Sequence, residues 1–368
     1  MTGAIRRFAW VELHRAAGIP LRAVRRDIAR ERARSNAGDL TRARLARLLD
    51  HAREHVPFYR DLLPRRSPDD DPFKTLAALP LLTPGMLRSE FDSLLGDDLD
   101  ARRWYDTGSA RSPVHLVQDA GHCAHAIATH ESFHASLGRR IGERAEVIWG
   151  DERNPDGGRS GVTKRICRVL ANEHWTESFR LTEEQMLALL KRLASRPPKL
   201  IVAYAPAIYE LARFAERNAI PVRPQRAIVT VPGTLDDPIR AAIERVFNCE
   251  AFNEYWSSAV GPVALECEAH AGVHVAPWAN YVEVVDAGGW ALPAGEEGQI
   301  VITCLTNYAM PLIRYAIGDA GSLAPAGTCT CGRDCQRLAT LRAHRTGPFQ
   351  PVEPARTARY ATWFRTPP

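Results

Sequence analysis

The middle of the chain alternates between short apolar runs and longer stretches whose apolar residues recur every three to four positions. The apolar runs predict buried strands at 145–150, 199–205, 226–231 and 250–256. The periodic stretches predict helices at 182–196, 206–218 and 235–248, and the first of them begins with a capping-box sequence at Thr182. Strands that alternate with helices in this way predict an α/β fold with a mostly parallel sheet.

The N-terminal part is expected to be helical. Residues 3–53 carry leucines at helical spacing among arginines, and a short helix is predicted to begin at Thr83-Pro84, where an N-cap residue precedes proline. A His- and Ala-rich stretch at 119–139 predicts another helix. Of its histidines only His130 and His134 are one turn apart, and a partly solvated face is expected there rather than a metal site.

Beyond Gly261 the helical pattern stops. Apolar and polar residues alternate at 274–286 and 298–306, on either side of a turn-rich connection, and this predicts antiparallel strands. The expected parts of the chain are a helical segment (1–65), an α/β core (66–260), an antiparallel β subdomain with a candidate zinc loop (261–345) and an irregular tail (346–368).

The composition is that of a globular protein. Of 368 residues, 45% are hydrophobic and 25% are charged, which excludes a disordered or fibrous chain. No apolar run approaches the ~18 residues of a membrane-spanning helix, and Arg6, Arg7 and Glu12 interrupt any N-terminal signal peptide, so we expect a cytoplasmic protein without a membrane partner. The net charge is only +5, and the arginines of 22–34 alternate with acids at helical spacing, so no nucleic-acid partner is expected.

Residues 253–321 contain a series of short motifs. An aromatic–Ser–Ser element at 255–258 is followed by Glu266-Cys267 and Val273-His274. The later motifs, in chain order, are Pro293–Glu296, Leu305–Asn307 and Met310–Tyr315, and the series ends at Gly318-Asp319. In this order the motifs resemble the phenylacetate–CoA ligase family, a branch of the adenylate-forming (acyl-AMP) enzymes. The resemblance extends over residues 44–346 and implies the large N-terminal domain of those enzymes.

The resemblance implies roles for individual residues. Asp319 would bind the two vicinal hydroxyls of a ribose. Tyr255 would stack against adenine or belong to the core, and Arg314 would pair with phosphate or with a structural carboxylate such as Glu296. The remaining expected site residues are Ser257 and Ser258 (catalytic), Arg345 (ribose or phosphate), Thr107 and Ser109 (phosphate loop) and Gly233 (beside the substrate pocket).

The eight cysteines do not form a disulfide framework in a chain of this length without an export signal. Cys329, Cys331 and Cys335 lie in one Gly-rich loop, and Cys267 lies in another loop with His270 and His274, an arrangement that zinc can use. Because some members of the resembled family carry a structural zinc at matching positions, the expected ligands are Cys267, His274, Cys329 and Cys331, with Cys335 and His270 in reserve. The other cysteines are expected to be small buried hydrophobes.

The sequence departs from the family in three places. In the expected phosphate loop, 105–113, Arg111 stands where a glycine belongs and no lysine is present, so that Arg111 either replaces the missing cation or blocks the loop. Ala259 stands where the resemblance implies an acid that helps to hold Mg²⁺. No lysine follows Lys199, so the catalytic lysine of the family's small C-terminal lid domain is missing, and the chain is interpreted as lacking that domain.

Three functions remain open at this point. The first is a truncated, degenerate ligase of secondary metabolism that uses ATP and Mg²⁺ to activate a small carboxylic acid through an acyl-AMP intermediate. The pocket walls expected at 204–209, 231–234 and 255–258 suit an aryl or short apolar acid. The second is a non-adenylating acyltransferase or condensation enzyme that uses an activated acyl group, and the third is an inactive homologue that binds a nucleotide or an acyl conjugate. A carrier protein, a separate lid-bearing enzyme and a homodimer are the expected protein partners.

Overall fold

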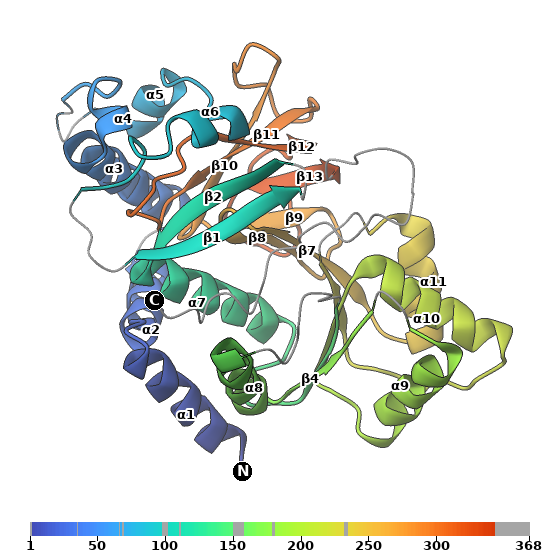
Figure 1. Cartoon of the computed structure of the whole chain (residues 1–368). Coiled ribbons are helices and arrows are strands. Elements are labelled where there is room, and N and C mark those ends of the chain that lie inside the picture. Colours follow the sequence, from blue (N-terminus) through green and yellow to red (C-terminus); the bar gives the residue numbers. More distant parts are fainter. Residues whose placement is uncertain are drawn as a thin grey trace. The chain divides into compact units, whose positions relative to one another are not determined.

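The computed structural model describes residues 2–34, 36–65, 67, 70–97, 102–109, 112–149, 158–178, 181–231 and 235–342. The chain divides into two compact units. Unit 1 comprises Met1–Ala17 and His130–Trp256, and unit 2 comprises Gly18–Thr129 and Ser257–Pro368. Helix α7 (Ala120–Ser136) begins in unit 2 and ends in unit 1 (Figure 1).

Unit 1 contains the parallel sheet that the alternating pattern predicts. Its strands run in the order β4-β3-β5-β6-β7, and every neighbouring pair is parallel. The strands are β3 (Ala145–Ile148), β4 (Glu173–Thr176), β5 (Leu200–Ala203), β6 (Ile228–Thr230) and β7 (Ala251–Ser257). The helices are α1 (Gly3–Ala16), α8 (Gly158–Ala171), α9 (Glu183–Ser195), α10 (Ala205–Arg217) and α11 (Asp237–Phe247).

Helices α9, α10 and α11 lie together beside the parallel strands (Figure 1). They pack because one face of each is apolar: Leu193, Leu211 and Phe247 are almost fully buried in a single cluster with Ile201 of β5 and Ile228 of β6. Burial of each such side chain contributes ~1.5–3 kcal/mol to folding. The predicted capping box of α9 is formed, because Thr182 Oγ1 accepts from the Gln185 amide (3.3 Å) and Gln185 Oε1 accepts from the Thr182 amide (2.9 Å).

Unit 2 contains the antiparallel region. Its strands run in the order β10-β11-β12-β13-β9-β8, and a separate hairpin joins β1 to β2. The strands are β1 (Arg102–Ser109), β2 (Ser112–Asp119), β8 (Gly261–Glu266), β9 (Val273–Val275), β10 (Asn280–Val285), β11 (Gly298–Cys304), β12 (Tyr315–Leu323) and β13 (Arg337–Arg342). The helices are α2 (Leu21–Arg34), α3 (Ala37–His55), α4 (Pro57–Arg60), α5 (Pro72–Ala77) and α6 (Pro84–Ser89).

Several elements differ from the sequence-based expectation. The hairpin β1–β2 occupies residues for which only a loop was expected, and α8, β4 and β13 were not predicted. Helix α7 was expected to have a partly solvated face of histidines, and this holds in part: His125 and His130 are partly exposed, whereas His122 and His134 are each 1% exposed. No helix in the described ranges is both long and apolar enough to cross a lipid bilayer.

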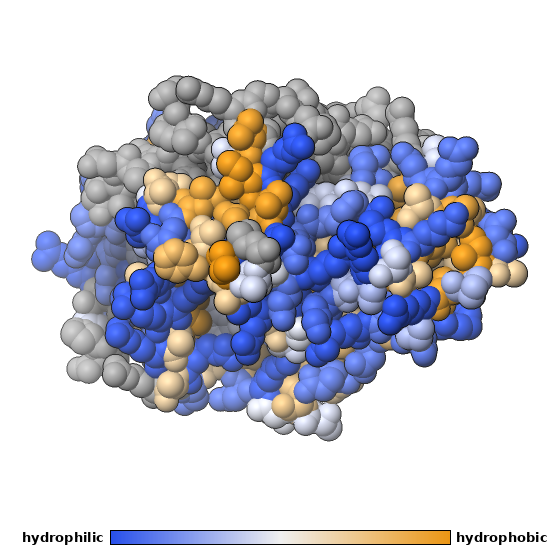
Figure 2. Space-filling model, turned by 90° about the horizontal axis from the view of Figure 1, so that it is seen from below, coloured by the Kyte–Doolittle hydropathy of each residue, from blue (hydrophilic) through white to orange (hydrophobic). Residues whose placement is uncertain are grey.

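Exposed apolar side chains gather on two contacting helices of unit 1, α1 and α8. The exposed side chains are Ile5 and Phe8 on α1 and Val162, Ile166 and Val169 on α8. Figure 2 shows them as a continuous hydrophobic patch on one face of the molecule. Arg6 of α1 donates a hydrogen bond to the Val169 carbonyl of α8, which links the two helices beside the patch.

Candidate functional site

Asp319 lies inside β12, in a bulge. Ile317, Gly318 and Asp319 together face a single residue of β11, because the pairing of the two strands skips these positions. Gly318 has a φ of +93°, a conformation that favours glycine. Bulges often redirect a side chain at a functional site, and here the partly exposed Asp319 leaves the regular alternation of the strand.

The aromatic–Ser–Ser element ends β7 and enters a turn. Tyr255 is 5% exposed, and Ser257 is buried, with its Oγ accepting from the Ala259 amide at 3.2 Å. Ser258 is partly exposed in the same turn. The burial of Tyr255 agrees with a place in the core, and its stacking against adenine stays a prediction, as do the catalytic roles of Ser257 and Ser258.

Arg314 pairs with a structural carboxylate, which is one of the two roles left open for it, and a role in phosphate binding stays a prediction. It is 3% exposed and forms an ion pair with Glu283 at 3.1 Å, not with Glu296. Its Nη1 donates to the Leu79 carbonyl (2.6 Å) and its Nη2 to the Gly289 carbonyl (2.7 Å). All three guanidinium nitrogens therefore contact protein partners, and the residue holds three segments of unit 2 together.

Asp119 is a residue whose structural role the sequence analysis missed. Its Oδ1 accepts from the His122 amide at 2.7 Å, which caps the N-terminus of α7, and its Oδ2 accepts from the Tyr308 amide at 2.8 Å. Asn307, from one of the family-like motifs, donates to the Val117 carbonyl of β2 at 2.9 Å. The aspartate at the start of the stretch predicted to be helical was the available signal. These bonds join the β2–α7 corner to the segment that precedes β12.

The expected phosphate loop is the hairpin β1–β2, with Ser109 paired to Ser112 across the turn. Thr107 lies in β1 opposite Val114. The side chains of residues 101–113 lie outside the described part of the structure, as do Arg111, Gly233 and Arg345 altogether. The roles expected of Thr107, Ser109, Gly233 and Arg345 stay predictions.

The Cys/His cluster assembles as the sequence predicts. Single ligand atoms of Cys267, His274, Cys329 and Cys331 all lie within 4.8 Å of one another. The Sγ atoms of Cys267 and Cys329 are 3.6 Å apart, and Cys331 Sγ is 3.4 Å from His274 Nε2. A tetrahedral zinc ion with its usual bond lengths requires edges of ~3.8 Å between sulfurs and ~3.6 Å between sulfur and nitrogen, so this geometry fits zinc closely.

The two reserve residues lie beside the cluster rather than in it. Cys335 Sγ contacts the other ring nitrogen of His274, Nδ1, at 3.4 Å, and His270 pairs with Glu266 at 3.4 Å. Burial and two nearby arginines lower the pKa of His274 to about 4, so its imidazole is neutral and able to bind a metal. Desolvation raises the pKa of Cys329, but hydrogen bonds from Cys331 and Cys267 outweigh it and lower the pKa overall, which favours a thiolate.

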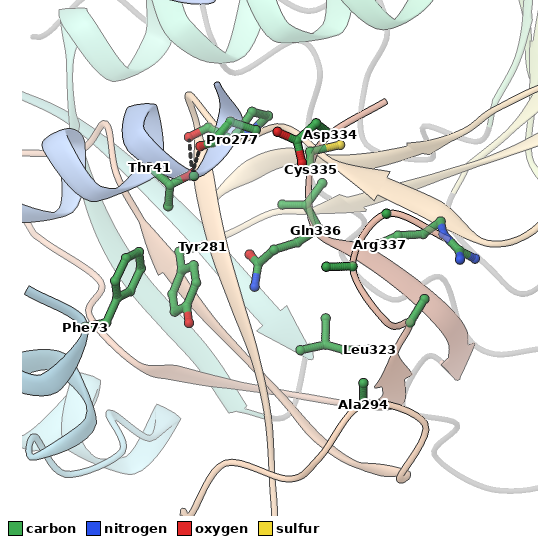
Figure 3. A pocket seen from close by; sticks show the side chains of 16 residues that line it. Thr41, Phe73, Pro277, Tyr281, Ala294, Leu323, Asp334, Cys335, Gln336 and Arg337 are labelled. Atoms are coloured by element: carbon green, nitrogen blue, oxygen red, sulfur yellow. Dashed lines mark hydrogen bonds between the residues drawn. The ribbon is translucent and has the colours of Figure 1, made fainter. Parts of the chain in front are cut away.

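A pocket of about 310 Å³ lies beside the loop that carries Cys335 in unit 2 (Figure 3). Its walls are mainly apolar, with the rings of Phe73 and Tyr281 on one side and Leu323 on another. Gln336 lines it too, but its amide is bonded to the backbone of Val282. Asp319 does not line this pocket, which is therefore a feature separate from the expected nucleotide site.

A second cluster lies in unit 1, where α7 meets β7. His130 Nδ1 is 3.2 Å from Glu254 Oε1, and His134 Nε2 is 3.5 Å from Glu254 Oε2. Burial opposes ionisation of Glu254, but the two histidines outweigh it and lower the pKa of Glu254 to about 2. Burial also lowers the pKa of His134, to about 4. Neither histidine is part of the expected nucleotide site.

Comparisons with known proteins agree with the family resemblance in the sequence. No family model matches the chain. A phenylacetate–coenzyme A ligase of Aromatoleum evansii is 29% identical over 310 residues, which are 79% of this chain and 66% of the relative. The phenylacetate–coenzyme A ligase of Thermus thermophilus is 29% identical over 321 residues, 82% of this chain and 69% of the relative. The chain is therefore similar to phenylacetate–coenzyme A ligases over about four fifths of its length.

More distant proteins are similar to the chain in sequence or in structure. Protein CapK of Staphylococcus aureus is 22% identical over 302 residues, 81% of this chain and 65% of that protein. A solved structure of 2-hydroxyisobutyryl-CoA ligase, with 2-HIB-AMP and CoA bound, superposes with a TM-score of 0.62 at 18% identity, over 83% of this chain and 67% of that one. The fold is therefore that of the large N-terminal domain of adenylate-forming enzymes. The chain spans about two thirds of the length of the curated relatives it matches.

Proposed function

We propose that this protein is an adenylate-forming, ligase-type enzyme that activates a small carboxylic acid and transfers the acyl group to CoA or another nucleophile. The similarity to phenylacetate–coenzyme A ligases over some four fifths of the chain, with Asp319 placed on a bulge of β12, is the observation that carries the proposal. We expect the acid to be aryl or short and apolar, because the aromatic and small residues at 204–209 suit such a substrate.

The chemistry needs little covalent participation from the protein. The carboxylate of the acid attacks the α-phosphorus of ATP, pyrophosphate leaves, and the resulting acyl-AMP is then attacked by the acceptor. Positioning and charge neutralisation supply most of the rate enhancement in such a displacement. In this proposal Asp319 accepts hydrogen bonds from both ribose hydroxyls and so fixes the α-phosphate relative to the acid.

The residues described do not fit Mg²⁺ at the place the family suggests. Ala259 has no ligand atom in its side chain and is 4% exposed. Glu254, close to it in sequence, is buried and bonded to His130 instead. No catalytic step is therefore assigned to a magnesium ion held by this element.

The same alanine favours a second candidate, an acyl-transfer enzyme that accepts a ready-made activated acyl group. Such a reaction releases no pyrophosphate and needs no divalent cation beside a triphosphate. The two candidates differ in one measurable reaction, because only the first exchanges pyrophosphate with ATP.

The exchange of labelled pyrophosphate into ATP, measured with a panel of aryl and short-chain acids, tests the proposal. At least one acid should support exchange, and Asp319→Asn should reduce it by tenfold or more. Asp61→Asn is the matched control, because Asp61 is an exposed aspartate of the same unit. Absence of exchange with every acid, combined with acyl transfer from acyl-AMP or acyl-CoA, would replace the first candidate by the second.

We also propose that Cys267, His274, Cys329 and Cys331 bind a structural zinc ion. The support is the near-tetrahedral spacing of their ligand atoms and the neutral state of His274. The ion would join the loop before β9 to the loop before β13, two segments with few apolar side chains of their own. Elemental analysis of untagged protein should find zinc that is lost in Cys329→Ser plus Cys331→Ser and retained in Cys249→Ser. A folded protein without zinc would refute the site.

A further inference from the structure

The His130, His134 and Glu254 cluster of unit 1 is a second place where metal-binding side chains converge. The two histidines are one turn apart on α7, and the glutamate comes from the adjacent strand β7. One ligand atom from each of the three lies within 4.8 Å of the others. We propose that this cluster binds a divalent transition-metal ion, with Zn²⁺ as the representative ligand, through two imidazole nitrogens and one carboxylate.

The spacing agrees with such a site. With metal–ligand bonds of ~2.0–2.2 Å, tetrahedral geometry requires neighbouring nitrogen and oxygen atoms to be ~3.4 Å apart. His130 Nδ1 lies 3.2 Å from Glu254 Oε1, and His134 Nε2 lies 3.5 Å from Glu254 Oε2, so each imidazole is at about this distance from one of the two carboxylate oxygens. A cation bound by both imidazoles would therefore lie between the two oxygens of one carboxylate, or bind one oxygen after a side-chain shift.

The polar atoms of the cluster are also poorly satisfied without a cation. His134 Nε2 and Glu254 Oε2 are both buried and lie 3.5 Å apart, and neither atom has a hydrogen bond of regular geometry within the described part of the chain. A buried polar atom without a hydrogen bond costs ~1–3 kcal/mol, and a metal ion between these two atoms would satisfy both. The side chains of His134 and Glu254 are 2% and 0% exposed, respectively.

The ligand set also indicates the class of metal and whether a coordination position stays open. Imidazole nitrogen with carboxylate oxygen suits Zn²⁺, Co²⁺, Ni²⁺ or Fe²⁺ rather than Mg²⁺ or Ca²⁺, which prefer oxygen ligands alone. Three protein ligands leave a coordination position for water or a further ligand. That position is reached from the side of His130, whose side chain is 17% exposed.

One neighbour weakens the binding. Arg139 Nη1 lies 3.5 Å from His134 Nδ1, at the outer limit of a hydrogen bond, and it favours the tautomer with the proton on Nε2. Metal binding at Nε2 moves that proton to Nδ1, beside the guanidinium. The metal affinity of this site is therefore expected to be lower than that of the Cys/His cluster. Added metal should fill the Cys/His cluster first and this site second.

Titration of the metal-free full chain with Co²⁺ distinguishes the two sites. Thiolate ligands give an intense sulfur-to-cobalt charge-transfer band, whereas a site of two imidazoles and one carboxylate gives only weak visible d–d bands. We expect the first equivalent of Co²⁺ to produce the thiolate spectrum. A second equivalent should add d–d absorption without further charge transfer, and Zn²⁺ should displace both equivalents.

Variants then assign the second equivalent. His130→Gln and Glu254→Gln should each weaken it at least tenfold and leave the charge-transfer band unchanged, which also reports that the protein is folded. His174→Gln is the matched control, because His174 also contacts a buried glutamate, Glu146, at 3.1 Å but has no second histidine there. Binding of a single equivalent by the wild type, or a second equivalent that His130→Gln and His174→Gln affect alike, would overturn the proposal.

Discussion

The buried ion pair of Arg314 and Glu283 allows the most quantitative prediction. Arg314→Met keeps the volume of the side chain but leaves Glu283, which is 7% exposed, without its partner and removes the donors to the Leu79 and Gly289 carbonyls. Loss of one partner of a buried pair typically costs 3–5 kcal/mol, so we expect a loss of about 4 kcal/mol at pH 7. Arg342→Met is the control: Arg342 pairs with Glu297 at 3.3 Å, but its side chain is 70% exposed, so ~0–1 kcal/mol is expected.

The same variant has a predicted pH dependence. Burial raises the pKa of Glu283, and the charge of Arg314 lowers it part of the way back. Without Arg314 the pKa of Glu283 rises further, so the folded state binds this proton more tightly than the unfolded state does. The folded variant therefore gains stability as the pH falls through that pKa, and its deficit relative to the wild type should be smaller near pH 4 than at pH 7.

Urea unfolding followed by tryptophan fluorescence measures both the loss of stability and its pH dependence. Each transition is analysed separately, because the chain has two units. Arg314→Met plus Glu283→Leu should recover part of the loss, because no charge then remains buried alone. If Arg314→Met costs no more than Arg342→Met, or if its deficit grows as the pH is lowered, the structural role assigned to Arg314 is refuted.

Three further predictions follow from local contacts. Thr182→Ala removes the capping box of α9 and should destabilise unit 1 by ~1 kcal/mol in the same unfolding assay, with Ser195→Ala, at the other end of the helix, as a near-neutral control. Burial, together with nearby Arg44, lowers the pKa of His125 to about 3, so this imidazole stays neutral in the folded state while the unfolded chain binds a proton below about pH 6.5. Its contribution to stability should fall by up to ~1.4 kcal/mol per pH unit below that point, and His125→Gln should flatten the profile. Treatment with a chelator should lower the melting temperature of the wild type more than that of the variant that lacks Cys329 and Cys331, as calorimetry would show.

Much of the architecture was predictable because hydrophobic periodicity and the order of the chain determine it. The strands at β5, β6 and β7, the helices between them and the cap at Thr182 are all local patterns. The hairpin β1–β2 was missed because its residues, read as a loop, lack a clear apolar alternation. Strand β13 was missed because its pairing with β12 and β9 depends on residues distant in sequence.

For the candidate site, residue type was more informative than position. The four candidate zinc ligands were predicted from soft side chains in two loops together with the family resemblance, and the structure brings the same four together. The partner of Arg314 was not predictable, because Glu283 is reached through the register of the antiparallel sheet and not through sequence proximity. The convergence of His130 and His134 with Glu254 likewise depends on the packing of α7 against β7, which no local pattern reveals.

The central claim is that Asp319 holds the ribose of a bound adenosine nucleotide, and calorimetric titration with AMP tests it most directly. The wild type and Asp61→Asn should bind AMP with similar affinity, and Asp319→Asn should bind it ~10–100-fold more weakly, as expected for the loss of charged hydrogen bonds worth ~1.5–3 kcal/mol. Equal affinity in all three proteins, or no detectable binding by the wild type, would contradict the claim.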